Sequence, residues 1–591
     1  MTLDSHRVVS LLRGKKLILL LLFIPLIVFG QQLNVVSVFP LQNDNTVTAN
    51  TEIRVDFNLP IDTTDIDNQF VVMGNMSGLY PASVLVNPSL QGVVLHPAAP
   101  FLIGEKVNVT ARSTLTGSGG ESFAGFNWRF TIKPTKLTPP YFSEPRVFSA
   151  FGGWYYSTMF PADVNNDNHI DIVILSGPIQ IAINDGLGNF SLAQQLSNPS
   201  ENPDTPITDL DLDGFKEIVA NDGIYEADGN GNFQFVQGLS HWVHDVADMN
   251  GDGYPDLLMH GFIGENGNII GISFNDGTGH FGSMDTVLTD SLIIDAIAGD
   301  FNNDGIGDIA YVTRIFATPG GTGGREAIAV AFMDSAGDTL YRSIHLSSSP
   351  HHILILDVNN DNFLDVFNSA ALSDSYFILN NQQGGFIDSA IAIGPGGDSY
   401  SWSFFGDITG DGWLDQLYIQ QSFFLDGGIC RYNINMGGFF GSVWGEDLEE
   451  RYNVLPFSVT AGDFNGDGSQ DVATLWNDGL RIFLNDDDVS IPSNQENIPQ
   501  QFTVYQNFPN PFNPATTIAF DLPKTSHVEL QIYDISGRKV KMLINQSMGT
   551  GSHRVVWDGL DESRVQAASG MYFYRIKAGN FQYIRKMVLL R

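Results

Sequence analysis

Short runs in which apolar and polar residues alternate occupy most of the chain after residue 33. Ile53–Phe57 and Lys106–Thr110 are examples from the N-terminal part, where Gly, Pro and Asn residues separate the runs. Alternation with a period of two is the pattern of half-buried β-strands. Residues 33 to about 134 therefore predict an all-β sandwich.

A second pattern, nine residues long, occurs seven times and each time leads into an apolar run. It has an acid at positions 1, 5 and 9, and Asn, Asp or Thr at position 3. Consecutive copies begin 46, 39, 52, 57, 50 and 56 residues apart, which is the period of a blade or solenoid unit. The copies span residues 163–171, 209–217, 248–256, 300–308, 357–365, 407–415 and 463–471.

These nine-residue loops have the composition of calcium sites. Ca²⁺ takes roughly six to eight oxygen ligands, which side chains at positions 1, 3, 5 and 9 and a backbone carbonyl at position 7 can supply. Position 6, where such a loop turns sharply, is Gly except for Asn168 and Asn362, and both residue types tolerate positive φ. Thr409, at position 3 of the sixth copy, is a poorer ligand and predicts the weakest site. The predicted ligands are Asp163, Asn165, Asp167, His169, Asp171, Asp209, Asp211, Asp213, Phe215, Glu217, Asp248, Asn250, Asp252, Tyr254, Asp256, Asp300, Asn302, Asp304, Ile306, Asp308, Asp357, Asn359, Asp361, Phe363, Asp365, Asp407, Thr409, Asp411, Trp413, Asp415, Asp463, Asn465, Asp467, Ser469 and Asp471.

The loops differ from EF-hands, which require a bidentate acid at position 12 and flanking helices. Position 12 carries no acid in any copy, being Ile174, Ala220, Met259, Tyr311, Asn368, Tyr418 and Thr474. Strand-like residues follow position 9 instead. Calcium loops of the thrombospondin kind are cysteine-rich, whereas this chain has one cysteine, Cys430. Solvated Asp and Asn turns remain the alternative to metal sites.

An Asp-Gly turn recurs after most loops, as in residues 184–190, 227–233 and 275–281. Asp-Gly between apolar runs predicts a hairpin, so each unit is expected to be a four-stranded antiparallel sheet. Loop and hairpin together resemble the FG-GAP or VCBS repeat family, which implies a seven-bladed β-propeller with Ca²⁺ at up to seven sites. The last unit lacks a fourth strand. We expect Arg146–Ser149 to supply it and so to remove the open edge.

Two flanking regions resemble other families. In residues 31–135, motifs such as Trp128–Thr131 resemble the bacterial Ig-like domain, which implies a spacer or docking module. Residues 505–591 contain Tyr505–Pro514, Ile532–Arg538 and Val556–Gly559. They resemble the C-terminal sorting domain of type IX secretion cargo, a small Ig-like β-sandwich. That resemblance implies export through the type IX machinery to the medium or the outer surface of a Gram-negative bacterium; a permanent Ig-like module is the alternative.

The N-terminus is expected to be a secretory signal. Basic residues precede an apolar run from Leu17 to Phe29, and Gly30 offers a cleavage site. Thirteen apolar residues fall short of the roughly 20 that a spanning helix needs, so a retained membrane anchor is the weaker reading. The predicted architecture is all-β, with a seven-bladed propeller flanked by two Ig-like sandwiches. Its parts are a signal peptide (1–30), an Ig-like sandwich (31–135), the propeller (140–488), a linker (489–503) and the sorting domain (504–591).

Charge and motifs limit the function. The chain has 66 acidic and 29 basic residues, a net charge of -37, which argues against nucleic acid as a partner. It contains none of the nucleophile, zinc-protease or phosphate-loop motifs. We therefore expect no enzyme activity, no catalytic residue and no organic cofactor, but calcium-dependent adhesion to an extracellular glycan or protein. A secreted polysaccharide-degrading lyase or hydrolase is the alternative. His351 with His352, or His241 with His244, could be metal ligands, although ordinary strand or loop histidines are the favoured interpretation.

Aromatic clusters are the remaining candidates for ligand contact. Trp154–Tyr156, Trp402 with Phe404 and Phe405, and Phe439 and Phe440 with Trp444 could form platforms that stack on sugars. Core packing is the more frequent role of such residues. Core packing is therefore the favoured interpretation.

Overall fold

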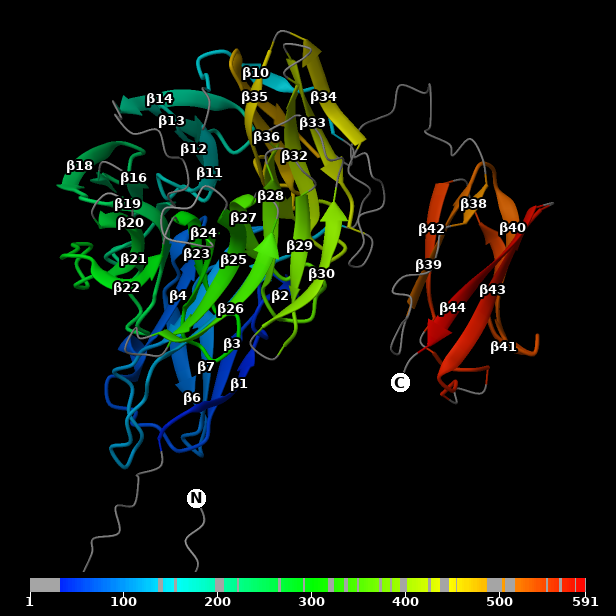
Figure 1. Ribbon diagram of the computed structural model, residues 1–591, viewed down its shortest axis with the longest axis horizontal. Helices are drawn as coiled ribbons and strands as arrows, with labels where there is room; N and C mark the ends of the chain where they lie inside the picture. The colour runs from blue at the N-terminus through cyan, green and yellow to red at the C-terminus, as the bar shows by residue number, and fades with distance from the viewer. Residues whose placement is uncertain are drawn as a thin grey trace, which may run out of the picture.

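The computed structural model has β-strands and one short 3-10 helix in the part of the chain that it describes (Figure 1). The described residues are 32–136, 142–153, 157–196, 207–220, 223–263, 267–290, 293–316, 324–333, 339–347, 350–370, 375–382, 385–393, 401–422, 427–435, 446–452, 454–485, 502–504, 516–548, 551–557, 559–562, 566–579 and 581–589. The predicted signal peptide lies outside them, as does most of the predicted linker. No helix among these residues is long and apolar enough to cross a membrane.

Residues 32–136 form the predicted sandwich, called here the N-terminal sandwich. Its core contains Trp128, Phe130 and Leu95, each no more than 1% exposed. Inward residues alternate with outward ones, as in Ile53–Phe57 with its buried-exposed period of two, because each strand packs one face on the other sheet. One sheet has the order β1(Val35–Phe39), β3(Ile53–Phe57), β7(Gly92–Pro97), β6(Ala82–Val86). The other has the order β2(Asp44–Val47), β9(Phe126–Ile132), β8(Lys106–Ala111), β4(Phe70–Gly74), β5(Gly78–Leu79), and η1(Ile66–Asn68) precedes β4.

Seven four-stranded antiparallel sheets follow within the described residues, one for each nine-residue loop. In each sheet the acidic loop joins the first strand to the second, as the sequence predicted. In order, the sheets are β11(Thr158–Ala162), β12(Asp171–Leu175), β13(Ile179–Asn184), β14(Phe190–Leu196); β15(Ile207–Thr208), β16(Glu217–Ala220), β17(Gly223–Ala227), β18(Phe233–Gly238); β19(Trp242–Ala247), β20(Asp256–Ile263), β21(Gly267–Ser273), β22(Asp285–Asp290); β23(Ile293–Gly299), β24(Asp308–Phe316), β25(Gly324–Met333), β26(Thr339–Ser347); β27(Pro350–Leu356), β28(Asp365–Ala370), β29(Ser375–Asn380), β30(Phe386–Ile393); β31(Ser401–Gly406), β32(Asp415–Ser422), β33(Gly427–Asn433), β34(Glu446–Tyr452); and β35(Pro456–Gly462), β36(Asp471–Trp476), β37(Gly479–Phe483) with β10(Arg146–Phe148).

Apolar clusters between neighbouring sheets join the seven sheets into a closed ring. One cluster contains Val173 of the first sheet and Ile218 of the second, and equivalent clusters lie between each following pair. The last contains Ala473 and Leu475 of the seventh sheet and Ile172 of the first. Both faces of these sheets are buried, which explains why runs such as Asp171–Leu175 are buried at every residue.

The predicted closure of the seventh sheet is confirmed. β10 pairs antiparallel with β37, and Val147 lies opposite Arg481. Phe148 packs on the cluster between the first and seventh sheets and lies 5.9 Å from the Phe190 ring. The strand that completes the last sheet therefore comes from before the first sheet, so the ring is closed by main-chain pairing as well as by apolar packing.

The C-terminal unit is a second sandwich, drawn apart from the others in Figure 1. Trp557, Tyr574 and Met587 are each 0% exposed in its core. Its sheets are β38(Thr503–Val504), β39(Thr516–Leu522), β42(Gly551–Trp557) and β41(Lys539–Met548), β40(Ser526–Asp534), β43(Gly570–Ala578), β44(Phe581–Leu589). The motif Tyr505–Pro514 lies outside the described residues.

Two neighbouring residues of β10 test the closure. Phe148→Ala removes a ring that packs between the first and last sheets, and we expect it to lower the free energy of unfolding by about 2 kcal/mol. Val147→Ala is the matched control, because Val147 is 54% exposed, and it should change stability by less than about 0.5 kcal/mol. Urea unfolding followed by fluorescence measures both. Equal midpoints for the two variants would contradict the role of β10 in closure.

Candidate metal centres

Each acidic loop turns through two left-handed residues. Position 6 has positive φ in all seven copies, from 65° at Asn168 to 92° at Gly214, as predicted. Position 4 also has positive φ, which the sequence analysis did not foresee, although Gly or Asn stands there in every copy except the second. That copy has Leu212 at φ 61°, a conformation that costs a branched residue roughly 1 kcal/mol.

The first loop shows how the predicted ligands converge. Asp163 accepts hydrogen bonds from the main-chain N–H groups of Asp167 at 3.1 Å and Asn168 at 2.9 Å. The Asn165 side-chain oxygen also accepts from Asp167 N–H, at 3.1 Å. Asp171 accepts from Val164 N–H at 3.1 Å. The loop therefore folds around its own side-chain oxygens, and position 1 makes the same type of bond to the position-6 N–H in every copy.

Burial separates the acids of each loop. The position-9 acid is at most 5% exposed in all seven copies, whereas Asp167 and Asp213 at position 5 are exposed. Burial raises the pKa of Asp256 to about 8, and the nearby charge of Asp248 adds to this increase. Burial likewise raises the pKa of Asp308 to about 8, and the nearby charge of Asp300 adds to this increase. Buried acids that repel each other favour binding of a cation, which would compensate their desolvation.

The donor sets match a hard cation. In the second loop, Asp209, Asp211 and Glu217 each offer an oxygen within 4.8 Å of the others, the one such group of acids, histidines or cysteines among the described residues. Burial raises the pKa of Glu217 to about 9. In the sixth loop, Thr409 Oγ1 is buried and has no hydrogen-bond partner. Oxygen-only sets of this kind suit Ca²⁺ rather than a transition metal.

Asparagines at the end of the third strand link successive loops. Asn275 donates its N–H to Asp256 at 2.9 Å and its side-chain amide to the Leu210 carbonyl of the preceding loop at 2.7 Å. Four other sheets repeat both bonds, through Asn184, Asn380, Asn435 and Asn485. The sequence showed several of these residues as the start of the hairpin motif, but it gave no sign of the bond to another unit.

Position-4 asparagines make links in the opposite direction. Asn166 donates to the Gly214 carbonyl of the next loop at 2.8 Å, and Asn360 to the Gly412 carbonyl at 2.9 Å. Asn303 contacts the fifth loop in the same way. Because these bonds connect consecutive loops, the acidic loops lie together on one face of the ring, called here the acidic face.

A separate polar cluster lies on the first strands of the third, fourth and fifth sheets. Asp295 is 3.4 Å from His244 Nδ1 and 3.0 Å from His352 Nδ1, and it also accepts from Ile353 N–H at 2.9 Å. Burial acts to raise the pKa of Asp295, but the two imidazoles hold that pKa well below its usual value. Both histidines stand out in the sequence, but they lie 108 residues apart, so no local pattern connects them to Asp295.

Two of the aromatic residues considered as a sugar platform pack in the core, as favoured from the sequence. Phe405 is buried between the fifth and sixth sheets, and Phe404 packs against the cluster between the sixth and seventh. Trp154–Tyr156 and the group of Phe439, Phe440 and Trp444 lie outside the described residues. The Phe404–Phe405 pair is therefore core.

Comparison with known proteins identifies three segments. Residues 30–132 match the family of the bacterial Ig-like domain, residues 344–418 the FG-GAP-like repeat, and residues 506–590 the secretion system C-terminal sorting domain. The chain therefore carries these three kinds of segment, as its motifs predicted, and it is a secreted or cell-surface protein of a Gram-negative bacterium. No curated protein sequence matches it.

Several solved structures are similar to this chain at low identity. PorZ, a surface component of the type-IX secretion system of Porphyromonas gingivalis, is 12% identical, with 92% of this chain and 75% of that chain covered and a TM-score of 0.27. The Dos1 propeller is 10% identical, with 70% and 94% covered and a TM-score of 0.31. YCF48 from Cyanidioschyzon merolae is 12% identical, with 60% and 99% covered and a TM-score of 0.34.

The link between loops can be tested at Asn275. Replacing it with Ala leaves the buried carbonyls of Leu210 and Pro255 without this donor, and we expect a loss of about 2 kcal/mol in the free energy of unfolding. Asn230→Ala is the matched control, because Asn230 is an exposed hairpin asparagine. Chemical denaturation measures the free energy of unfolding of both variants. Similar values would contradict a stabilising role for the bond from Asn275 to the preceding loop.

Proposed function

We propose that this protein is a calcium-binding, seven-bladed β-propeller that acts outside the cell in adhesion, binding a glycan or a protein without catalysing a reaction. The observation that carries the proposal is the sevenfold recurrence of a buried position-9 acid beside a position-1 acid in an oxygen-lined loop. The predicted side-chain ligands at positions 1, 3, 5 and 9 and the position-7 carbonyl would hold one Ca²⁺ in each loop. Calcium would supply positive charge where several buried carboxylates meet.

Calcium would then be a structural component. A site with a dissociation constant of about 0.1 mM in about 1 mM calcium gains about 1.4 kcal/mol by linkage. Seven such sites would contribute on the order of 10 kcal/mol, comparable with the whole stability of a typical domain. A ring without disulfides would need such a contribution outside the cell, and the one cysteine of the chain, Cys430, is buried.

The C-terminal sandwich supports the route of export. Its match to the secretion system sorting domain favours recognition of this unit by the type IX machinery. The N-terminal sandwich and the ring would be the exported cargo. The acids that define the repeat are used in the loops, so they identify the external ligand only by class, as a glycan or a protein.

A second candidate, a polysaccharide-degrading enzyme, is favoured by one observation. Asp295, His244 and His352, on the first strands of three neighbouring sheets, combine a buried acid with imidazoles. Many acid–base sites have this composition. Incubating the protein and its Asp295→Asn variant with a polysaccharide panel tests this candidate. Turnover that the variant abolishes would favour the enzyme, whereas glycan-array binding without turnover would favour adhesion.

Removal of calcium should destabilise the ring. We expect excess chelator to lower the melting temperature of the full chain by at least about 10 °C relative to 1 mM calcium. Calorimetric titration should give up to seven sites. A melting temperature that does not respond to chelator, with no heat of calcium binding, would refute the proposal.

A single loop can be tested at its buried acid. Asp256→Asn removes a charge from the third loop, so it should lose one calcium site and reduce the stabilisation by calcium by about 1.4 kcal/mol. Asp276→Asn is the control, since Asp276 is an exposed acid in the adjacent hairpin. Calcium stoichiometry, measured by titration calorimetry, should fall by one for the first variant only.

A further inference from the structure

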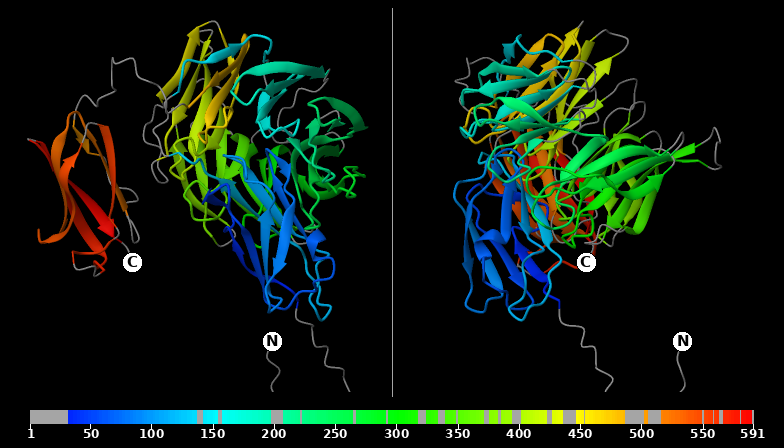
Figure 2. Two further views of the ribbon diagram at one scale, coloured as in Figure 1. Left: turned by 180° about the vertical axis from the view of Figure 1, so that it is seen from behind. Right: turned by 90° about the vertical axis from the view of Figure 1, so that its left-hand side faces the viewer.

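Figure 2 shows the N-terminal sandwich, in blue, lying against the ring. This arrangement differs from the expectation of a spacer, since the sandwich lies against the ring rather than extending away from it. Hydrogen bonds join it to loops one, three, four, five and seven. The Thr46 side chain lies beside Gly412 of the sixth loop, and Thr208, the residue before the second loop, donates to Met73 Sδ at 3.4 Å. A domain that touches all seven loops is placed to respond to the state of all of them.

Main-chain groups make several of these contacts. The N–H groups of Ser113, Asn127 and Thr135 donate to the carbonyls of Gly251, Gly305 and Gly468 at 2.7, 2.9 and 3.0 Å. In the first loop the direction is reversed, and Asp163 N–H donates to the Met76 carbonyl at 2.8 Å. The accepting glycines stand at positions 4 and 6, the two left-handed turns of the loop. Contact with the sandwich therefore depends on the main-chain conformation of the loops.

The backbones approach each other too closely for side chains at one point. A Cβ atom on Gly125 of the sandwich would lie 2.7 Å from the Gly251 carbonyl oxygen of the third loop. A Cβ atom on Gly251 would lie 3.0 Å from Gly125 Cα. Both glycines have positive φ. The interface depends on a specific loop shape here, because neither backbone can shift toward the other.

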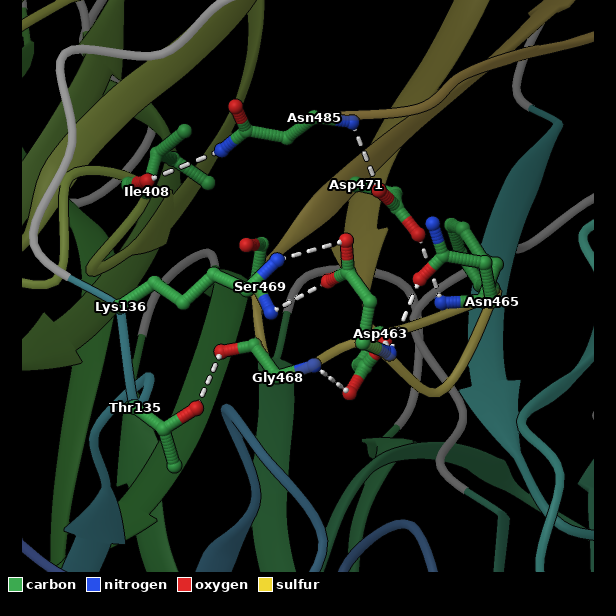
Figure 3. A network of polar contacts seen from close by, with 11 residues as sticks. Thr135, Lys136, Ile408, Asp463, Asn465, Gly468, Ser469, Asp471 and Asn485 are labelled. Atoms are coloured by element: carbon green, nitrogen blue, oxygen red, sulfur yellow. Dashed lines mark hydrogen bonds and ion pairs between the residues drawn. The ribbon is translucent and has the colours of Figure 1, made fainter. Parts of the chain in front are cut away.

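Side chains of the sandwich also reach the predicted ligands themselves. Gln42 Nε2 donates to Asp300 at 3.2 Å, Thr110 Oγ1 to Asp248 at 3.1 Å, and Lys136 Nζ to Asp467 at 3.1 Å. Figure 3 shows the last of these beside the seventh loop, where Lys136 and Thr135 approach from the sandwich. A carboxylate accepts several such bonds, so these donors can remain when it also binds a cation.

Charge complementarity favours the same docking. The Arg112 guanidinium lies 4.6 Å from the centre of the Tyr254 ring at position 7 of the third loop. Burial lowers the pKa of Arg129 to about 10, while the negative charges of Asp245 and Asp300 act to raise it. Basic side chains of the sandwich thus face acids of the ring.

We propose that the N-terminal sandwich is a calcium-responsive cap, docked on the acidic face when the loops hold Ca²⁺ and loosened when they lose it, so that the external ligand must bind elsewhere on the ring. This inference rests on the proposed calcium function. Binding of calcium fixes the loop shape that the sandwich contacts, and by linkage docking must strengthen calcium binding in return. Because the cap is part of the same chain, release raises local mobility without dissociation.

Hydrogen exchange of the full chain tests the cap. In calcium, the amides of Ser113, Asn127 and Thr135, which bond to the ring, should be protected; in chelator their exchange should accelerate at least tenfold. The amide of Val109, which lies in β8 inside the sandwich, is the internal reference and should stay protected. Calcium stoichiometry is measured in parallel by titration calorimetry.

A pair of variants separates docking from folding. In one double variant, Asn127→Ala removes the side-chain bond to the Asp248 carbonyl and Arg112→Ala removes the contact with the Tyr254 ring. It should speed exchange at the interface amides even in calcium and weaken calcium binding severalfold. Arg54→Ala is the control, because Arg54 is an exposed residue of β3 that pairs with Glu52, and it should change neither.

The outcomes distinguish the two proposals. If calcium binds with the expected stoichiometry but exchange at the interface amides is the same in chelator, the cap is overturned and the calcium function stands. If the double variant matches the control, the interface itself is overturned. If no calcium binds, the proposed function fails, and the cap fails with it.

Discussion

The position-9 carboxylate is the group on which the ring depends. In every copy it accepts the N–H of position 2, and in six copies it also accepts an N–H from the end of the third strand. It thereby connects the loop with the hairpin of its own sheet. Such a charge is costly to bury unless hydrogen bonds and a cation compensate it. The proposed calcium ions would therefore compensate a cost that arises from the way each sheet is assembled.

The same interaction extends from one sheet to the next. The asparagine whose N–H meets the carboxylate uses its side chain to reach the loop of the preceding sheet, as Asn184 reaches the Phe464 carbonyl at 2.8 Å. This bond joins the first sheet to the seventh, across 280 residues of sequence. Apolar clusters fill the same interfaces, and β10 adds main-chain pairing. Directional hydrogen bonds fix how the sheets are placed, while burial of apolar surface supplies most of the driving force.

The arrangement has a consequence for recognition. The acids of the nine-residue loops lie on the face that the N-terminal sandwich contacts, and Gln42, Thr110 and Lys136 already bond to three of them. An external ligand would meet other surfaces of the ring, such as the region of Trp242, which is 49% exposed on β19. The loops therefore account for 22 of the 66 acidic residues, a third of the total.

The sequence by itself determined the features that are local. Spacing of acids along nine residues predicted the loops, Gly or Asn at position 6 predicted positive φ, and the missing fourth strand predicted the pairing of β10. Each of these depends on residues close in sequence or on a strand edge that must be covered. The tertiary structure alone decided the asparagine links, the Asp295 cluster with His244 and His352, and the docking of the N-terminal sandwich. Those contacts join residues far apart in sequence, and no local pattern encodes which surfaces meet when the ring closes.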